Sequence, residues 1–400
     1  MNPVAAFLFA AVLGGSGGQA ATPPTVPERN DLEKRLSALH RRAEGVKPGT
    51  AGGQALCREL GEVGRGYLDA GDPGRAIEIL EEAYEWDNDD GLVLAELTLA
   101  YVRAQQYPFA RLYLELAEER APHAPPEAYA ALGEVYYSLN RVEDALLAWE
   151  LFQRLGGEDP RVLRRLAHVR SELSLAAGQK FLGTDDFSVY FDAAVPKEAV
   201  EEIARHLGEA YREESAEVEA RLPAEQVVIL YAGRAYFSLV SIPDWVSGVF
   251  DGKIRVCVDP DGGITPQLEA VLSHELAHAL IRRASRDRAP GWLHEGLAQW
   301  WEGKRILRKE FKEVLGGRTP FTLDELEGNF ARRADRATAR ASYAEALGLV
   351  EYLLQERGMG SLACVLRDLA EGASLAETLQ RETGFSSREL VSRWKLWASL

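Results

Sequence analysis

The order of apolar and polar residues divides the chain into two parts. Between residues 56 and 160, apolar residues recur at helical spacing in segments that are separated by short turns. After residue 178 the pattern changes: residues 187–195 and 225–233 have strand-like patterns, and residues 196–222 between them form one amphipathic helical pattern. The sequence therefore predicts a multidomain α+β protein with an all-helical first part and a mixed second part.

The first part repeats itself along the chain. Ala76, Ala110 and Ala145 occupy equivalent positions, and their separations are 34 and 35 residues. Small and aromatic residues recur at two further positions, in the sets Gly64, Thr98, Gly133 and Tyr67, Tyr101, Tyr136. This pattern resembles the tetratricopeptide repeat (TPR) family. The resemblance implies about three stacked helix pairs at 56–178, closed by a capping helix at 161–177, with a surface for a protein partner that the sequence does not identify.

The amino terminus has the pattern of a secretory signal peptide. An apolar stretch from Val4 to Leu13 is followed by Gly and Ser, and then by Ala20 and Ala21 before two prolines, although no Lys or Arg precedes the stretch. A bilayer span needs about 20 apolar residues, and no stretch of the chain is that long. We therefore predict a signal peptide at 1–21, an N-terminal helical segment at 22–55, export to the periplasm or the medium, and no stable membrane span.

Charge and cysteine content exclude two classes of function. The chain has 46 Lys and Arg against 62 Asp and Glu, a net charge of −16. Such a chain repels the phosphate backbone, so we expect no nucleic-acid partner. The three cysteines lie more than a hundred positions apart, so a thiolate metal cluster is not expected.

The most informative motif lies in a predicted helix at 266–284. His274 and His278 are four positions apart, which places both imidazoles on one helix face within reach of one zinc ion. Glu275 is rotated by about 100° around the helix and borders the same cleft without binding the metal. The motif therefore predicts one zinc site with Glu275 as the catalytic acid and base.

A catalytic zinc needs a third protein ligand and one open position, so another segment must contribute. Residues 290–303, PGWLHEGLAQWWEG, predict a second helix that begins after a Pro-Gly turn. Glu295, 17 positions after His278, is the expected third ligand. His294 is the rival, but it would point about 100° away from Glu295 on the same helix.

Together, HELAHAL and WLHEGLAQWWEG resemble the gluzincin metallopeptidases, and more narrowly the peptidase-MA-like group, over roughly residues 186–400 of a domain predicted at 179–400. The resemblance implies a zincin-like domain with the same three ligands and the same base, which hydrolyses peptide bonds in a peptide or protein substrate. Relatives often carry an aspartate one turn after the glutamate ligand, where this chain has Gln299. Gln299 can accept a hydrogen bond from an imidazole N–H but adds no charge.

The resemblance also suggests two further features of the site. Relatives supply a second donor to the tetrahedral oxyanion from a later helix, and Tyr343, near the start of a predicted helix at 339–354, is the candidate here. The strand GKIRVCVD at 252–259 resembles the edge strand on which such peptidases lay an extended substrate.

Three functions remain open from the sequence. The first is a zinc metallopeptidase whose TPR-like array recruits a substrate or partner. The second is an exported, non-catalytic TPR scaffold with a structural or silent zinc site, which Gln299 favours. The third is a zinc amidase that acts on cell-wall peptides.

Overall fold

A computed structural model describes residues 26–398, except for 105, 121–123, 177, 223–225, 241, 243–245, 262, 307, 316–317, 328–329 and 331–334. The expected signal peptide at 1–21 lies outside the described residues. The described chain forms two compact units, with the boundary between Ser174 and Leu175. Within the described ranges, no helix is both long enough and apolar enough to cross a bilayer.

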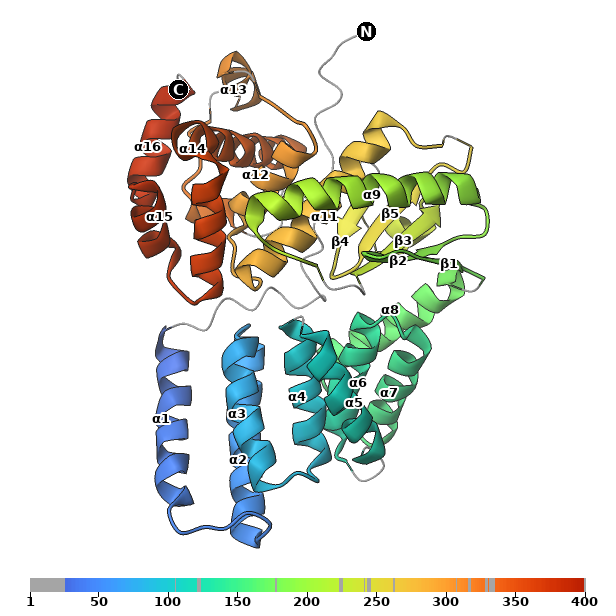
Figure 1. Cartoon of the computed structure of the whole chain (residues 1–400), viewed down its shortest axis with the longest axis vertical. Helices are drawn as coiled ribbons and strands as arrows, with labels where there is room; N and C mark the ends of the chain where they lie inside the picture. Colours follow the sequence, from blue (N-terminus) through green and yellow to red (C-terminus); the bar gives the residue numbers. More distant parts are fainter. Residues whose placement is uncertain are drawn as a thin grey trace. The chain divides into compact units, whose positions relative to one another are not determined.

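The regular elements that the structure describes in the first unit are all helices (Figure 1). The helices are α1 (Val26–Ala43), α2 (Ala51–Asp69), α3 (Pro73–Trp86), α4 (Gly91–Arg103), α5 (Tyr107–Arg120), α6 (Pro126–Ser138), α7 (Val142–Arg154) and α8 (Pro160–Ala176). The pairs α2 and α3, α4 and α5, and α6 and α7 pack most closely. This arrangement is compatible with the repeat array that the sequence predicts, and α8 lies where the capping helix is expected.

Capping side chains set where these helices begin. Thr50 accepts a hydrogen bond from the Gly53 amide at the start of α2, and Asp90 accepts from two amides at the start of α4. Asp72 caps α3, where Pro73 occupies the first turn. Each cap satisfies backbone N–H groups that have no partner inside the helix.

Equivalent positions in the predicted repeats make equivalent contacts. The Tyr101 hydroxyl of α4 donates a hydrogen bond to Glu81 of α3, and the Tyr136 hydroxyl of α6 donates to Glu118 of α5. Each tyrosine thereby ties the first helix of one pair to the second helix of the preceding pair. A hydrogen bond of this kind contributes about 1 kcal/mol to stability.

Glycines allow the helices within a pair to approach closely. A Cβ atom added to Gly133 of α6 would lie 2.1 Å from Nε1 of Trp149 on α7. At the equivalent position in the first pair, a Cβ on Gly64 would lie 2.6 Å from Cγ of Leu80. The small residues that define the repeat are therefore required by the large side chains opposite them.

The second unit contains a five-stranded mixed sheet in the order β1-β2-β3-β5-β4. The strands are β1 (Lys180–Gly183), β2 (Phe187–Phe191), β3 (Gln226–Ala232), β4 (Gly248–Phe250) and β5 (Ile254–Val258). The three central strands β2, β3 and β5 are parallel, and β1 and β4 are antiparallel to their neighbours. The strand GKIRVCVD, expected at the edge, is the internal strand β5. The edge strands are β1 and β4. Strand β4, the edge beside β5, has only three residues, too few for an alternating pattern to reveal it.

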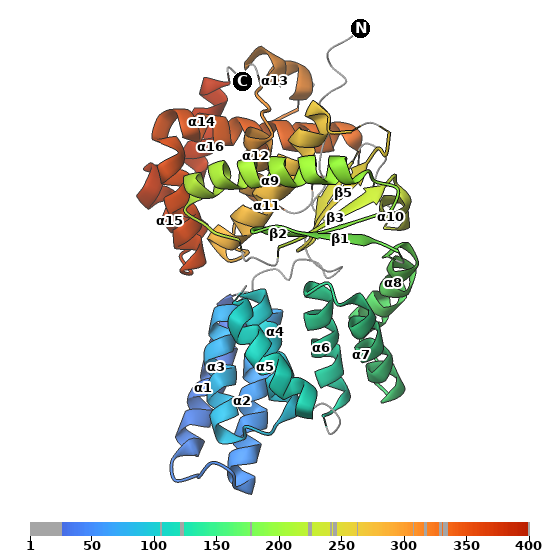
Figure 2. The same ribbon diagram turned by 45° about the vertical axis from the view of Figure 1, so that its right-hand side comes forward.

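The two faces of this sheet pack against different elements, and long helices lie on one of them (Figure 2). Val228 and Leu230 of β3 pack into the main core, to which α9 (Lys197–Val218) and α11 (Pro266–Ser285) contribute. Val227, Ile229 and Tyr231, the alternate residues, pack into a smaller cluster with α10 (Ala235–Leu239). The alternation follows from the two-residue period of a strand.

The rest of the second unit is mainly helical. It comprises α12 (Gly291–Trp301), α13 (Arg308–Leu315), the short 3-10 helix η3 (Asp324–Leu326), α14 (Arg336–Ala370), α15 (Leu375–Thr383) and α16 (Ser387–Trp397). Helix α14 is kinked at Gly358, whose φ of 76° lies in the region that favours glycine. Helix α12 packs against both α11 and α14.

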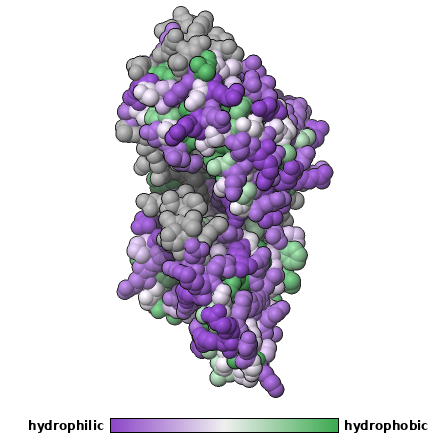
Figure 3. Space-filling view, turned by 90° about the vertical axis from the view of Figure 1, so that its left-hand side faces the viewer, coloured by the Kyte–Doolittle hydropathy of each residue, from purple (hydrophilic) through white to green (hydrophobic). Residues whose placement is uncertain are grey.

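Hydrophilic residues dominate the face of the molecule that Figure 3 presents, and hydrophobic residues are scattered over it. The large hydrophobic side chains that the described structure exposes most include Leu396, Phe181, Leu112 and Leu147. They come from helices and strands in both units. Scattered exposure of this kind is normal for a globular protein surface.

We predict that Gly133→Ala destabilises the first unit. The added methyl group overlaps the buried Trp149 indole, and overpacking of this kind costs about 1–3 kcal/mol in the free energy of unfolding. Thermal and urea unfolding of the full chain, followed by circular dichroism, measure the effect. Gly208→Ala in α9 is the control, because nothing lies within 4 Å of the added atom and helix propensity favours alanine by up to about 1 kcal/mol. Equal stability of the two variants would contradict the close approach of α6 and α7.

Candidate metal centre

Helix α11 carries both histidines of the HELAHAL motif. Thr265 caps the helix by accepting a hydrogen bond from the Leu268 amide, and Pro266 occupies its first turn. His274 and His278 lie in the middle of the helix, and both side chains are fully buried. One helix face therefore presents two imidazoles at a spacing of one turn.

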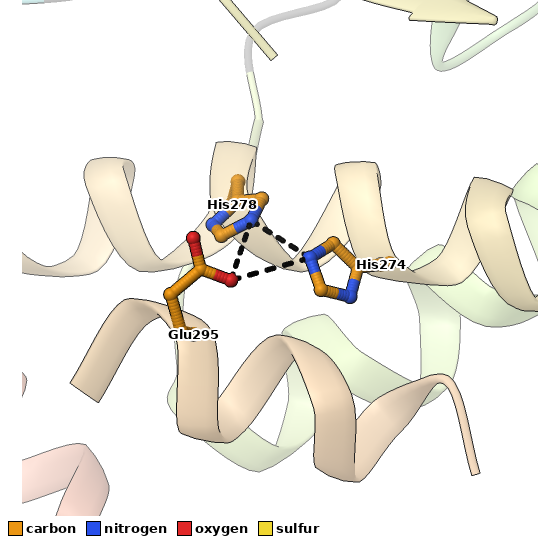
Figure 4. Close-up of side chains that lie close together, drawn as sticks. All are labelled: His274, His278 and Glu295. Atoms are coloured by element: carbon orange, nitrogen blue, oxygen red, sulfur yellow. Dashed lines mark hydrogen bonds and ion pairs between the residues drawn. The ribbon is translucent and has the colours of Figure 1, made fainter. Parts of the chain in front are cut away.

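Helix α12 brings a carboxylate to the two imidazoles (Figure 4). Nε2 of His274 lies 3.0 Å from Nε2 of His278. Oε2 of Glu295 lies 3.6 Å from the first of these nitrogens and 3.9 Å from the second. The structure thus brings together the three residues that the sequence nominates as metal ligands.

Close packing of α12 on α14 fixes Glu295 at this point. The next residue, Gly296, faces α14, where an added Cβ would lie 2.4 Å from the carbonyl oxygen of Ala346 and 2.5 Å from Cγ2 of Val350. A side chain at this position would push α12 away from α14. The glycine of the WLHEG segment is therefore required by the packing that positions the carboxylate.

The three ligand atoms fit a tetrahedral divalent metal. Zinc binds imidazole nitrogen and carboxylate oxygen at about 2.0–2.2 Å, which places tetrahedral ligand atoms about 3.3–3.6 Å apart. The observed separations of 3.0, 3.6 and 3.9 Å lie around that range. Within the described part of the chain, Oε2 of Glu295 is buried without a hydrogen-bond partner, as a metal-binding oxygen would be. Nitrogen and oxygen donors in this arrangement suit zinc.

The electrostatics of the site also favour a cation. Burial lowers the pKa of the His274 imidazole, but Glu302, Glu295 and Glu275 outweigh burial and raise that pKa to about 10. Burial, followed by the nearby His274, lowers the pKa of His278 well below its ordinary value. The carboxylates therefore stabilise one positive charge at His274, and the second imidazole stays neutral.

Glu275 lies beside the ligands and is fully buried. Among the described residues, neither of its carboxylate oxygens has a hydrogen-bond partner. Burial raises the pKa of this carboxyl well above its ordinary value; nearby His274 opposes the rise, and Glu295 and Glu302 add to it. Buried carboxylates with such strongly shifted pKa values are concentrated at functional sites, because leaving them unpaired is costly.

Glu302 orients His274, a role that the sequence analysis gave to Gln299. Oε2 of Glu302 lies 2.9 Å from Nδ1 of His274, and its other oxygen forms an ion pair with Lys304. Only 1% of the Glu302 side chain is exposed. A carboxylate on the far nitrogen fixes the ring and makes the metal-facing nitrogen a better ligand.

Gln299 has a different contact from the one expected. Its Nε2 donates hydrogen bonds to the backbone carbonyl oxygens of Glu295 and Tyr343, both at 2.9 Å. It therefore joins α12 to α14 and accepts no hydrogen bond from an imidazole in the described structure. The expectation was wrong because it assumed a partner one turn after Glu295, whereas Glu302 follows Glu295 by seven positions, about two turns.

His294 lies behind His278 and does not face the ligand atoms. Its Nδ1 is 3.5 Å from Nδ1 of His278, whereas the atom of His278 that faces Glu295 is Nε2. Burial is the main reason that the pKa of His294 falls to about 4. The geometry therefore favours Glu295 over His294 as the third donor.

Tyr343 lies in the first turns of α14 and is 4% exposed. Its ring packs edge-on against Phe330, with 5.4 Å between the ring centroids. Burial raises the pKa of its hydroxyl well above the ordinary value, and the charges of Glu295 and Glu275 raise it further. The structure thus brings Tyr343 into the electrostatic environment of the site.

Comparison with known proteins finds a family similarity in this part of the chain. Residues 226–399 match the model of the Peptidase MA superfamily, a stretch that runs from β3 to α16 and contains both helices of the site. No curated protein matches the chain. The match supports the coarser sequence prediction, a peptidase-like domain, over residues 226–399.

Proposed function

We propose that this protein is a zinc-dependent metallopeptidase that hydrolyses peptide bonds in a peptide or protein substrate. One observation carries the proposal: two imidazole nitrogens and one carboxylate oxygen lie at tetrahedral separations beside a buried, unpaired glutamate. His274, His278 and Glu295 would hold a single zinc ion. When bound there, zinc supplies Lewis acidity, which polarises a carbonyl and makes a water molecule easier to deprotonate.

Glu275 is the proposed acid and base. Its carboxylate accepts a proton from the water whose oxygen attacks the carbonyl carbon of the substrate. As the C–N bond breaks, the same carboxyl group gives that proton to the amine that leaves. The raised pKa of Glu275 suits the role of base, because it makes the carboxylate a stronger acceptor for the proton of water, and a pKa nearer to the working pH lets the same group act in both forms.

Tyr343 is the proposed donor to the oxyanion. A phenol can donate a hydrogen bond only while it is protonated, and burial raises the pKa of this hydroxyl well above the ordinary value. A buried donor aimed at developing negative charge stabilises it more strongly than water does. The proximity of Tyr343 to Glu275 and Glu295 supports this role.

The edge strand β4 is the proposed binding surface for the substrate backbone. The Cys257 amide donates to the carbonyl oxygen of Ser247 at 2.8 Å, which identifies this pair as one that exchanges hydrogen bonds. Such pairs alternate along an antiparallel ladder, so the backbone groups of Gly248 and Phe250 point away from β5. An extended peptide can add to the sheet by pairing with these groups.

For the first unit, we propose a TPR-like array that recruits a substrate or protein partner. The equivalent contacts of Tyr101 and Tyr136, and those of Gly64 and Gly133, support a repeat origin. The proposal includes export after removal of residues 1–21. The scaffold alternative depended on the missing charge at Gln299, and Glu302 supplies that charge from another position.

We predict that zinc binding and catalysis separate in two variants. Glu275→Gln should retain one zinc per chain and lose at least about 100-fold in kcat, because it keeps the ligands and removes the base. Glu295→Ala should bind zinc more weakly, because a ligand is lost. Metal analysis and cleavage of unfolded casein, with a cell-wall peptide amide assayed in parallel, measure both effects. Wild type that takes up no zinc on reconstitution would contradict the proposal, as would an active Glu275→Gln.

Glu302→Gln should weaken zinc binding by about 10–100-fold, since the charge that orients His274 is removed. Glu351→Gln is the matched control: Glu351 is another partly buried carboxylate of the second unit, and it accepts a hydrogen bond from the Ile306 amide instead. Its zinc affinity should equal that of wild type. Competition with a chromogenic chelator gives the dissociation constants. Equal zinc affinity for Glu302→Gln and wild type would remove Glu302 from the site.

Zinc binding should release protons at neutral pH. The pKa of His274 is about 10 in the metal-free site, so this imidazole carries a proton at pH 7 that zinc must displace. Zinc affinity should therefore rise with pH up to about 10. Titration calorimetry at pH 7 in buffers of different ionisation enthalpy counts the protons that are released. We expect the release of at least about one proton for each zinc ion bound. Binding without proton release would show that His274 is neutral before zinc arrives.

A further inference from the structure

We propose that Gly248 of the edge strand β4 is a positioning residue that sets where the Glu275 carboxylate lies. The inference rests on the proposed function, because it concerns the base of that reaction. It adds a residue that belongs to neither of the two sequence motifs. Three observations carry it: the contact at Gly248, its backbone conformation, and the lack of hydrogen bonds at Glu275.

A side chain at residue 248 would meet two side chains of α11, Val271 and the carboxylate end of Glu275. An added Cβ would lie 2.7 Å from Oε1 and 2.8 Å from Cγ of Glu275, and 2.5 Å from Cγ1 of Val271. These separations are shorter than any van der Waals contact permits. Alanine at this position would have to displace the Glu275 side chain, the Val271 side chain or the strand.

Backbone conformation does not explain the glycine. The φ angle of Gly248 lies outside the positive region that favours glycine, so any residue could adopt this backbone. Only the space taken by α11 excludes a side chain. The glycine therefore serves the contact between β4 and α11.

Packing takes the place of hydrogen bonds in orienting the base. Within the described residues, both oxygens of Glu275 lack a hydrogen-bond partner, whereas His274 is fixed by Glu302. Because Gly248 has no side chain, the Glu275 carboxylate can lie close to the backbone of β4, and this backbone limits how far the carboxylate can move toward the strand. A change at residue 248 should therefore move the base and leave the three ligands in place.

The same residue faces the substrate. In the strand pairing derived above, the amide and carbonyl of Gly248 point away from β5, toward the edge where a peptide would add. One residue thus adjoins the base and contacts the substrate backbone. The distance from Glu275 to a paired peptide would then be set by a single backbone position.

The test compares Gly248→Ala with wild type and with Gly208→Ala, the α9 glycine whose added Cβ meets no atom within 4 Å. We expect kcat to fall by about 10–100-fold in Gly248→Ala, because a displacement of about 1 Å has effects of that size. KM should change by less than about threefold and zinc affinity by less than about twofold, as the ligands are untouched. Equal kcat in Gly248→Ala and Gly208→Ala would overturn the proposal.

A second variant separates the base from general packing. Val271→Ala removes the other group that the new methyl would meet, and leaves Glu275 intact. If Gly248 positions the base, the double variant Gly248→Ala/Val271→Ala should fold and bind zinc as wild type does, and kcat should remain low. Recovery of kcat in the double variant would assign the defect to Val271 and overturn the proposal.

A double-mutant cycle on unfolding tests the contact without reference to activity. Gly248→Ala should lower the melting temperature of the metal-free chain, and should lower it less in the Glu275→Ala background, where the carboxylate and Cγ are gone and only the overlap with Val271 remains. Additive shifts in melting temperature would show that residues 248 and 275 do not interact, and would overturn the proposal. Zinc-loaded wild type that cleaves no peptide, together with a coupled cycle, would show that the proposed function fails while the contact exists.

Discussion

The second unit depends on how closely α11, α12 and α14 approach one another. The ligand atoms on α11 and α12 must lie within 4 Å of each other, and this is possible because Gly296 lets α12 rest on the backbone of α14. Gln299 then ties α12 to α14 by two hydrogen bonds. The metal site is therefore as rigid as the helix packing beneath it, which is what a preorganised site requires.

The packed helices enclose a cluster of buried charged side chains. Glu275, Glu295 and Glu302 are carboxylates in a buried site with two imidazoles. Glu275 and Glu295 have oxygens without hydrogen-bond partners in the described structure, and Glu302 is paired with His274 and Lys304. Burying unpaired charge is costly, so the metal-free site pairs the carboxylates with a protonated His274. A divalent cation balances the same charges more fully.

The sequence predicted the features that depend on local periodicity. His274 and His278 follow from a four-residue spacing on one helix, and the small and aromatic positions of the repeats follow from a fixed period. Glu302 was missed because helical geometry allows a partner at either one turn or two turns from Glu295, and Gln299 filled the nearer position. Strand β4 was missed because three residues carry no pattern. The role of Glu302 and the position of β4 both depend on how separate elements pack, and residue spacing alone does not encode that packing.

The position of the site along the chain has a consequence for folding. All three ligand atoms and Glu302 come from residues 274–302, two consecutive helices joined by a short turn after Ser285. Closing so short a turn costs little entropy, whereas pairing β2 with β3 brings together residues 39 positions apart, such as Phe187 and Gln226. The helical hairpin can thus form before the sheet is complete. A metal ion bound to it would then act as a folding nucleus as well as a cofactor.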